Sequence, residues 1–380
     1  MYPKVKPALA RAWRDLQTVQ FGVTPDHAVV LGPVDTATGA LIDRIDGTRR
    51  MELLRAEAAG MGLPDGLADE LVRRLAGAGL LDDATAGGPR AQAVRKRPEA
   101  LERLGPDLGS LSLVHREPGG DLRGIAARRA IRVQVRGSGR VGALIAAVLS
   151  GAGVGGVEVL DGGRVEPGDV APGGFGSGSV GRPRGEAAGR LVRESAPGRA
   201  PRAGESGGPE PGLALVVVAP RDGLQAWAPD PDTAADWVAT GVPHLYAGVL
   251  EGTGLVGPLV LPGTTACAGC MERERVDLDP AWPRMLVQWR SAHRRRAGGA
   301  CDLGLSTMVA GLAAAHALSF LDGELPASTA SRWEAALPAL HWQRSPVGPH
   351  PDCPCGASAG RPAVLQRLGG GSGGDPPEGP

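Results

Sequence analysis

A glycine-rich turn in the middle of the chain constrains its fold more than any other segment. Residues 137–142 read Gly-Ser-Gly-Arg-Val-Gly, follow the apolar run 131–135 and open the alanine-rich stretch 143–149. This order of strand, turn and helix places a phosphate group on a helix N-terminus. The same G-x-G-x-x-G pattern occurs elsewhere because the chain contains 60 glycines. Only this copy lies between a predicted strand and a predicted helix, so only this copy predicts a nucleotide-binding fold.

A carboxylate follows the turn at the distance that such a fold requires. Residues 157–160 form a second strand pattern, and Asp161 closes it. In dinucleotide-binding folds an acid about 20 residues after the turn binds the ribose. The sequence therefore predicts an α/β, Rossmann-like domain. Its predicted cofactor-binding residues are Gly137, Gly139, Gly142 and Asp161.

The charge balance gives no indication of a nucleic-acid or membrane partner. The chain has 41 basic and 41 acidic residues and a formal net charge of zero. No apolar run approaches the roughly 20 residues of a membrane span, and the N-terminus lacks the apolar core of a secretion signal. Five cysteines in such a chain predict metal or thiol chemistry rather than disulfides. The predicted compartment is therefore the cytoplasm.

Changes in composition divide the chain into four predicted segments. The first is a small α+β, winged-helix-like domain, and the second is a weakly patterned connector. The third is the Rossmann-like domain, interrupted at 195–212 by a loop rich in proline, glycine, arginine and serine. The last is a glycine-rich tail that is predicted to be disordered. The four segments are residues 1–85, 86–125, 126–356 and 357–380.

The first segment shows short strand and helix patterns. Strands are predicted at 18–23 and 27–31, joined by a turn at 24–26. Three helices are predicted to follow, and in the third Leu67, Leu71 and Leu75 form an apolar stripe at helical spacing. Residues 80–82 resemble the wing of a winged helix. The predicted helices are 36–45, 51–59 and 67–75.

Two cysteine pairs that are far apart in the sequence predict a structural zinc site. Cys267 and Cys270 form a C-x-x-C knuckle, and Cys353 and Cys355 form a tighter C-x-C pair. Four thiolates complete a tetrahedral zinc shell and leave no position open for a substrate. The alternative is that the four are unrelated buried thiols. The remaining Cys301 is interpreted either as a small core residue or as a nucleophile.

Together, these features resemble the ThiF/MoeB superfamily, the relatives of ubiquitin-activating enzymes. The resemblance covers about residues 126–356 and includes the glycine turn, Asp161, the zinc knuckle within 264–270 and a closing helix within 304–323. It implies that the chain binds ATP and magnesium and adenylates the C-terminal glycine of a ubiquitin-like carrier protein. It also implies a homodimer.

Several charged residues of that family are replaced in this chain. The second acid of the usual D-x-D is Gly163, and the family lysine becomes Arg184, with Arg182 nearby. The magnesium aspartate falls at Arg221, and Asp222 is one residue away. Arg182, Arg184 and Asp222 are therefore the candidate catalytic residues, and unless they substitute for the missing set the ATP site is degenerate.

One branch of the superfamily fits a degenerate site. Its members carry an N-terminal winged-helix-like domain that binds the leader of a precursor peptide, and they present the precursor to a partner enzyme, often a YcaO-type cyclodehydratase. Residues 1–85 resemble that domain. In this interpretation the leader adds as a strand to the edge of the sheet formed by 18–23 and 27–31, beside the helix 67–75.

Three other functions are weighed against this one. DNA binding by a winged helix requires a basic face, but residues 1–85 contain ten Lys and Arg against twelve Asp and Glu, a net charge of −2. The basic run Arg290 and 294–296 is interpreted as a solvated loop. A dinucleotide oxidoreductase would share the glycine turn but would not explain the paired cysteines. An active adenylyltransferase remains the main alternative to a peptide-binding scaffold.

Overall fold

A computed structural model describes residues 1–198, 212–293 and 299–357 of the chain. These residues form two compact units. Residues 1–130 make up most of the first unit, and residues 131–357 make up most of the second. The predicted loop 195–212, the basic run 294–296 and the predicted tail 357–380 lie largely or wholly outside the described residues.

The first unit begins with two small antiparallel sheets. The strands predicted at 18–23 and 27–31 are confirmed as a pair, with Val19 opposite Leu31, although Gly22 at φ +85° and a 3-10 turn, η1, shorten both. A polar strand that the sequence did not indicate completes the sheet in the order β2-β3-β4. A second sheet pairs β1 with β5, the segment predicted as a wing. The elements are β1 (Pro3–Val5), β2 (Arg11–Asp15), β3 (Thr18–Phe21), η1 (Pro25–His27), β4 (Val29–Leu31) and β5 (Leu81–Asp83).

Three helices pack beside these strands, as predicted. The predicted stripe is confirmed, because Leu71 and Leu75 are almost fully buried and Leu67 is partly buried in the same core. Asp35 caps the first helix by accepting a hydrogen bond from the backbone N–H of Thr38. The helices are α1 (Thr36–Asp43), α2 (Met51–Gly60) and α3 (Leu67–Gly77).

The segment predicted as a connector is largely helical. Its helices are short and contribute few apolar residues each, which is why their period is weak in the sequence. They share a small core, in which Leu104 and Ile125 are fully buried. The helices are α4 (Gly88–Arg95), α5 (Pro98–Arg103), α6 (Gly105–Val114) and α7 (Gly120–Arg128).

A buried lysine joins these helices to the N-terminal strands. Lys6 is 1% exposed, and its ammonium group donates to the carbonyl oxygens of Ser112 at 2.6 Å and Arg116 at 3.1 Å. Both carbonyls lie at the C-terminal end of α6 or just beyond it, where carbonyl groups lack helical partners and favour a cation. Burial lowers the pKa of Lys6 because it penalises the charged form. The two carbonyl oxygens offset part of that cost by accepting hydrogen bonds from the ammonium group.

We expect Lys6→Met to loosen α6 and α7. The substitution leaves two buried carbonyls without their donor, a loss of about 1–3 kcal/mol. Hydrogen–deuterium exchange of the amides of 105–128 should become faster. Lys96→Met is the matched control, because Lys96 is exposed and should change nothing. Unchanged protection in both variants would show that Lys6 does not hold these helices.

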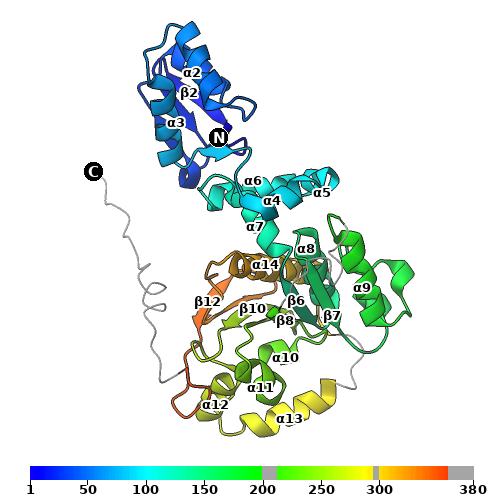
Figure 1. Ribbon diagram of the computed structural model, residues 1–380. Coiled ribbons are helices and arrows are strands. Elements are labelled where there is room, and N and C mark those ends of the chain that lie inside the picture. The colour runs from blue at the N-terminus through cyan, green and yellow to red at the C-terminus, as the bar shows by residue number, and fades with distance from the viewer. Residues whose placement is uncertain (199–211, 294–298, 358–380) are drawn as a thin grey trace. The chain divides into compact units, whose positions relative to one another are not determined.

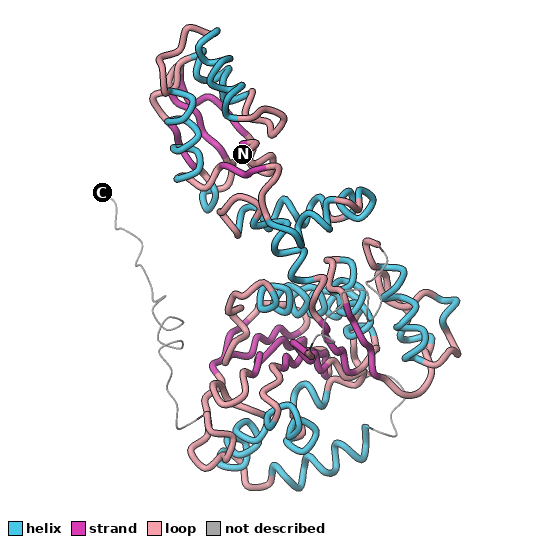
Figure 2. The backbone as a smooth tube through the Cα atoms, viewed as in Figure 1, coloured by secondary structure: helices cyan, strands magenta, loops and turns pink. Residues whose placement is uncertain are grey.

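The second unit is built on a seven-stranded mixed sheet (Figures 1 and 2). Its strand order is β12-β11-β10-β9-β8-β6-β7. The half containing β7, β6, β8 and β9 is parallel, and β10, β11 and β12 continue it antiparallel. The strands are β6 (Arg132–Arg136), β7 (Gly156–Leu160), β8 (Leu213–Val218), β9 (His244–Leu250), β10 (Thr253–Val260), β11 (Ser331–Ala336) and β12 (Gln343–Pro346).

Helices cover both faces of this sheet, which gives the predicted α/β Rossmann-like layering. One core lies between the sheet and helices α8 and α14, and a second lies between the sheet and helices α11 and α12. Figure 2 shows the strands enclosed between these two helical layers. The helices are α8 (Arg140–Gly151), α9 (Arg184–Ser195), α10 (Leu224–Trp227), α11 (Pro231–Ala239), α12 (Ala268–Leu278), α13 (Trp282–His293) and α14 (Leu303–Leu321), with 3-10 turns η2 (Pro167–Asp169) and η3 (Ser177–Ser179).

Helix α14 corrects the expectation that no apolar run approaches the length of a membrane span. It has 19 residues and a mean hydropathy of 1.5, so by length and composition it is the one described helix that could cross a membrane. Its Val309, Ala310 and Ala313 are fully buried against the sheet and α8. This burial is that of a core helix, which meets the same criteria of length and apolar composition.

Candidate functional site

The glycine turn connects β6 to α8 at the carboxyl end of the parallel strands, where open α/β sheets bind ligands. Gly137 has φ +102°, and a Cβ there would lie 2.2 Å from the carbonyl oxygen of Ala219 at the end of β8. A Cβ on Gly142 would lie 2.1 Å from the carbonyl oxygen of Gly137. Both glycines are therefore required for the backbone to close on itself. Gly139 is less crowded, with the Arg221 side chain 3.0 Å from its Cβ position.

Asp161, the predicted ribose ligand, lies directly after β7 and reaches this turn. Its Oδ2 accepts hydrogen bonds from the backbone N–H of Ser138 at 2.7 Å and from the Ser138 hydroxyl at 2.8 Å. The Nε of Arg184 lies 3.1 Å from the same oxygen and forms an ion pair with it. Protein groups therefore already engage one oxygen of this carboxylate.

The three candidate catalytic residues have different positions. Arg184 begins α9 and lines a cavity beside the turn, whereas Arg182 is exposed and is not among the lining residues. Asp222 lines the same cavity but is exposed, and its carboxylate accepts from the backbone N–H of Leu224 at the start of α10. The structure thus brings Arg184 and Asp222 to one cavity and leaves Arg182 outside it.

Arg221 occupies the place where the resemblance expects a magnesium aspartate. Its guanidinium donates to Oδ1 of Asp169 and to Oε2 of Glu166, both at 2.6 Å. Asp169 is only 3% exposed, and its other oxygen accepts from the backbone N–H of Glu166 at 2.9 Å. Burial lowers the pKa of Arg221, but the hydrogen bonds to these two carboxylates outweigh burial, and the net effect is a raised pKa. The pair fastens the loop after β7 to the loop after β8.

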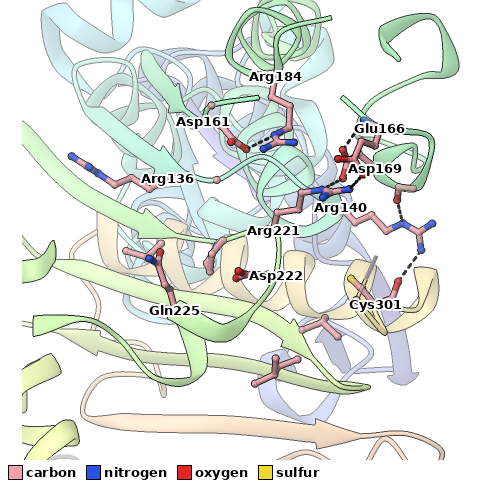
Figure 3. Close-up of a pocket in the computed structure, with 18 of the residues that line it drawn as sticks. Arg136, Arg140, Asp161, Glu166, Asp169, Arg184, Arg221, Asp222, Gln225 and Cys301 are labelled. Carbon is pink, nitrogen blue, oxygen red and sulfur yellow. Dashed lines mark hydrogen bonds and ion pairs between the residues drawn. The ribbon is translucent and has the colours of Figure 1, made fainter. Parts of the chain in front are cut away.

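The cavity itself has a volume of about 1070 Å³ and is lined by residues of the second unit (Figure 3). Sequence reasoning missed two of its cations. Arg140 donates to the carbonyl oxygens of Gly168 at 2.7 Å and Cys301 at 2.8 Å. Arg136 donates to Oε1 of Gln134 at 2.9 Å and lies over the ring of Trp237. Arg136 directly precedes the glycine motif and Arg140 lies within it. Their position in the sequence could therefore have identified them as residues of the cavity.

Cys301 lies at the cavity wall as a half-buried free thiol. Burial raises the pKa of this thiol, against the opposing effect of Arg140. A raised pKa reduces the thiolate fraction, which a nucleophile needs. The environment of Cys301 is thus that of a small wall residue and not that of an activated nucleophile.

The two cysteine pairs meet in a single cluster. Cys267 and Cys270 flank the start of α12, and the four sulfur atoms lie within 4.8 Å of one another. The Sγ separations are 3.6 Å for Cys267–Cys353, 3.6 Å for Cys270–Cys355 and 3.9 Å for Cys267–Cys270. Metal–sulfur bonds of about 2.3 Å in a tetrahedron require about 3.8 Å between sulfurs. The cluster therefore fits a tetrahedral metal ion.

The surroundings of the cluster also favour a cation. The hydrogen bond to Cys270, and then burial, raise the pKa of Cys267, because neighbouring thiols cannot all ionise without a compensating charge. A bound metal supplies that charge and deprotonates its ligands. The Nη1 of Arg273 lies 3.8 Å from the sulfur of Cys353, where its positive charge would offset the net negative charge that four thiolates keep around a divalent ion.

We expect Cys270→Ser to lose the metal. Removing a ligand should weaken metal affinity by more than the roughly tenfold that loss of an outer partner costs, and it should lower the melting temperature. Native mass spectrometry would measure metal per chain. Cys301→Ser is the matched control and should keep one metal per chain. Equal metal content in both variants would contradict a four-cysteine site.

Comparisons with known proteins agree with this geometry. The model of a family described as the ThiF family matches residues 121–355. The fold is similar to a crystal structure of E. coli MccB with ATP, with a TM-score of 0.62, 15% identity, and coverage of 93% of this chain and 99% of that one. It is similar to the microcin C7 biosynthetic enzyme MccB in complex with N-formylated MccA, with a TM-score of 0.63, 15% identity and the same coverage.

A third similar structure is that of PaaA. Its TM-score is 0.65 at 15% identity, and the match covers 90% of this chain and 99% of that one. No curated protein sequence matches the chain significantly. Identities this low establish the fold alone. The coverage extends that likeness to nearly the whole length of each of these proteins, including the segment before the nucleotide-binding fold.

Proposed function

Because this chain belongs to the ThiF family, we propose that it binds the leader of a precursor peptide and presents that peptide to a partner enzyme in modified-peptide biosynthesis. In this proposal its adenylation site is degenerate. Arg221 is the observation that carries the proposal. An adenylating enzyme needs a metal ion and positioned cations around the α-phosphate. Here a guanidinium bonded to Asp169 and Glu166 belongs to the residue that replaces the magnesium aspartate expected from the family resemblance.

The likeness to MccB supports a peptide as the partner. MccB has been crystallised with the peptide MccA and with ATP, and the match covers nearly all of its length. The partner enzyme that we propose is of the YcaO type, the assembly is a homodimer, and the compartment is the cytoplasm. The metal that we propose is zinc, which would be held by Cys267, Cys270, Cys353 and Cys355 as a structural ion with no open position.

The first unit offers an edge on which a leader can add as a strand. Among the described residues, β4 pairs only with β3, so its other side has no strand partner there. Val30 in this strand is 49% exposed. Arg74 of α3 donates to the carbonyl oxygen of Gly32 at 2.8 Å, which places the helix beside the end of the strand. An extended peptide on this edge would gain main-chain hydrogen bonds from β4 and side-chain contacts from α3.

We expect Val30→Glu to weaken leader binding by at least about tenfold, or about 1.4 kcal/mol. The reason is that a charge on the exposed apolar face of β4 would meet the apolar side chains of the peptide. Fluorescence anisotropy with labelled leaders of the small open reading frames next to this gene would measure affinity. Leu16→Glu is the control, because Leu16 is 91% exposed at the turn between β2 and β3. Equal affinities of the two variants would move the docking site elsewhere.

We also expect no adenylation. ATP–pyrophosphate exchange with magnesium and the full-length precursors should stay at the background of the protein-free reaction, because Arg221 already binds Asp169 and Glu166, the acids that could hold magnesium. Exchange that depends on the precursor would instead establish the alternative function, an active ThiF-type adenylyltransferase acting on a peptide or carrier C-terminus. Leader binding and exchange are measured separately, so each result stands alone.

A further inference from the structure

We propose that the cavity beside the glycine turn binds a phosphate-bearing ligand as the metal-free anion, with the guanidinium of Arg221 in place of a divalent cation. This inference deepens the proposed function and rests on it, because it states what a degenerate adenylation pocket still binds. It predicts that magnesium opposes binding, whereas in an adenylating site magnesium is required.

The first step is that Arg221 occupies the acids that a metal would need. Both oxygens of Asp169 are already bonded, one to Arg221 and one to the backbone N–H of Glu166. An oxygen of Glu166 accepts from the same guanidinium. Magnesium binds through carboxylates and keeps a strict octahedral shell at about 2.0–2.1 Å. It would have to break both charge-assisted bonds and then lie next to the displaced cation.

The second step is that the other acids lining the cavity offer a metal little. Asp161 is already paired with Arg184, and no cluster of three ligands faces the cavity among the described residues. In the described ranges, the four cysteines are the only set of three or more acidic, histidine or cysteine side chains close enough to hold an ion. Asp222 and Glu251 line the cavity, but both are exposed. Water screens such charges, so these two carboxylates do little to repel a bound anion.

The third step is that two lining arginines form no ion pair with a carboxylate among the residues that the structure describes. Arg140 is held by two carbonyl oxygens, and Arg136 is held by the amide oxygen of Gln134 and the ring of Trp237. Carbonyl and amide oxygens orient a guanidinium without cancelling its charge. Figure 3 shows the two arginines on either side of Arg221. A planar guanidinium can donate two parallel hydrogen bonds to two oxygens of a phosphate group, which is a strong, charge-assisted interaction.

The fourth step concerns the turn itself. Gly139, the N-cap residue of α8, makes no side-chain cap, so the first N–H groups of this 12-residue helix are not capped by it. The side chain of Arg221 borders Gly139, with its Cγ 3.0 Å from the position of a Cβ there. A phosphate at the turn would therefore meet both the helix N-terminus and the guanidinium. It would compete with Glu166, which is half exposed, for the same donor.

Titration calorimetry with ATP as the probe tests this proposal. The full chain, loaded with its cysteine-bound metal, is titrated once with magnesium in excess and once without added magnesium. For the second titration, protein and ATP are exchanged into magnesium-free buffer without a chelator, so that the cysteine-bound metal is retained. We expect binding to be at least about tenfold tighter without magnesium, or about 1.4 kcal/mol. The reason is that a magnesium ion on the phosphates would face the Arg221 guanidinium.

Two substitutions at one position sharpen the test. Arg221→Gln should weaken metal-free binding by about tenfold and abolish the preference for metal-free ATP. Arg221→Asp should reverse the preference, because it frees Asp169 and Glu166 and adds a third carboxylate. Arg193→Gln is the matched control, since Arg193 is exposed on α9 and does not line the cavity. Circular dichroism and metal content establish that each variant is folded.

The possible outcomes separate this inference from the proposed function. Binding by the unaltered chain that requires magnesium would overturn the inference. Absence of binding at millimolar ATP in both conditions would overturn it too, and would leave leader-peptide recognition standing. Precursor-dependent pyrophosphate exchange would overturn the proposed function itself. A wild-type preference for metal-free ATP that Arg221→Asp reverses would establish the role of Arg221.

Discussion

The close approach of two backbone segments at the end of the parallel sheet determines the geometry of the cavity. The turn at Gly137 lies so near the carbonyl oxygen of Ala219 that no side chain fits between them. The backbone N–H of Ala219 donates to the backbone carbonyl oxygen of Arg136 at 2.8 Å. Because Ala219 is fixed there, Arg221, two residues later, must lie over the turn. From that position its guanidinium reaches the acids of the loop after β7.

Arginines then order the loops around the cavity without a ligand. Arg184 pairs with Asp161 and donates to the carbonyl of Arg164, while Arg140 joins the crossover loop to the segment before α14. Each bond is charge-assisted, and several lie in partly buried surroundings where such bonds are strengthened. The side chains of the cavity wall therefore cross-link its loops by themselves.

The sequence was sufficient for features that depend on local chemistry. Gly137 and Gly142 are required by backbone geometry alone, and the cysteine pairs carry their ligand spacing within a few residues. The sequence did not predict elements whose apolar residues lack a clear helical or strand periodicity. Helices α4 to α7 are short, and β2 is polar and exposed on every residue, so neither gave a pattern. Strand β9, almost fully buried, was missed because a short apolar run does not distinguish a strand from a helix.

In the cavity, the sequence indicated single residues but not the partners that these residues bind. Asp161 was predicted as a ribose ligand from its distance to the turn, but the sequence could not show that Arg184 and Ser138 would share one of its oxygens. Arg221 was recognised as a departure from the family pattern, whereas its partners were not, because Asp169 and Glu166 lie more than 50 residues away. A single replacement of an acid by arginine inverts the charge at one position. When the same arginine also binds the neighbouring acids, it engages the carboxylates that a metal ion would need. The proposed loss of adenylation and the proposed metal-free anion site would therefore both follow from one side chain.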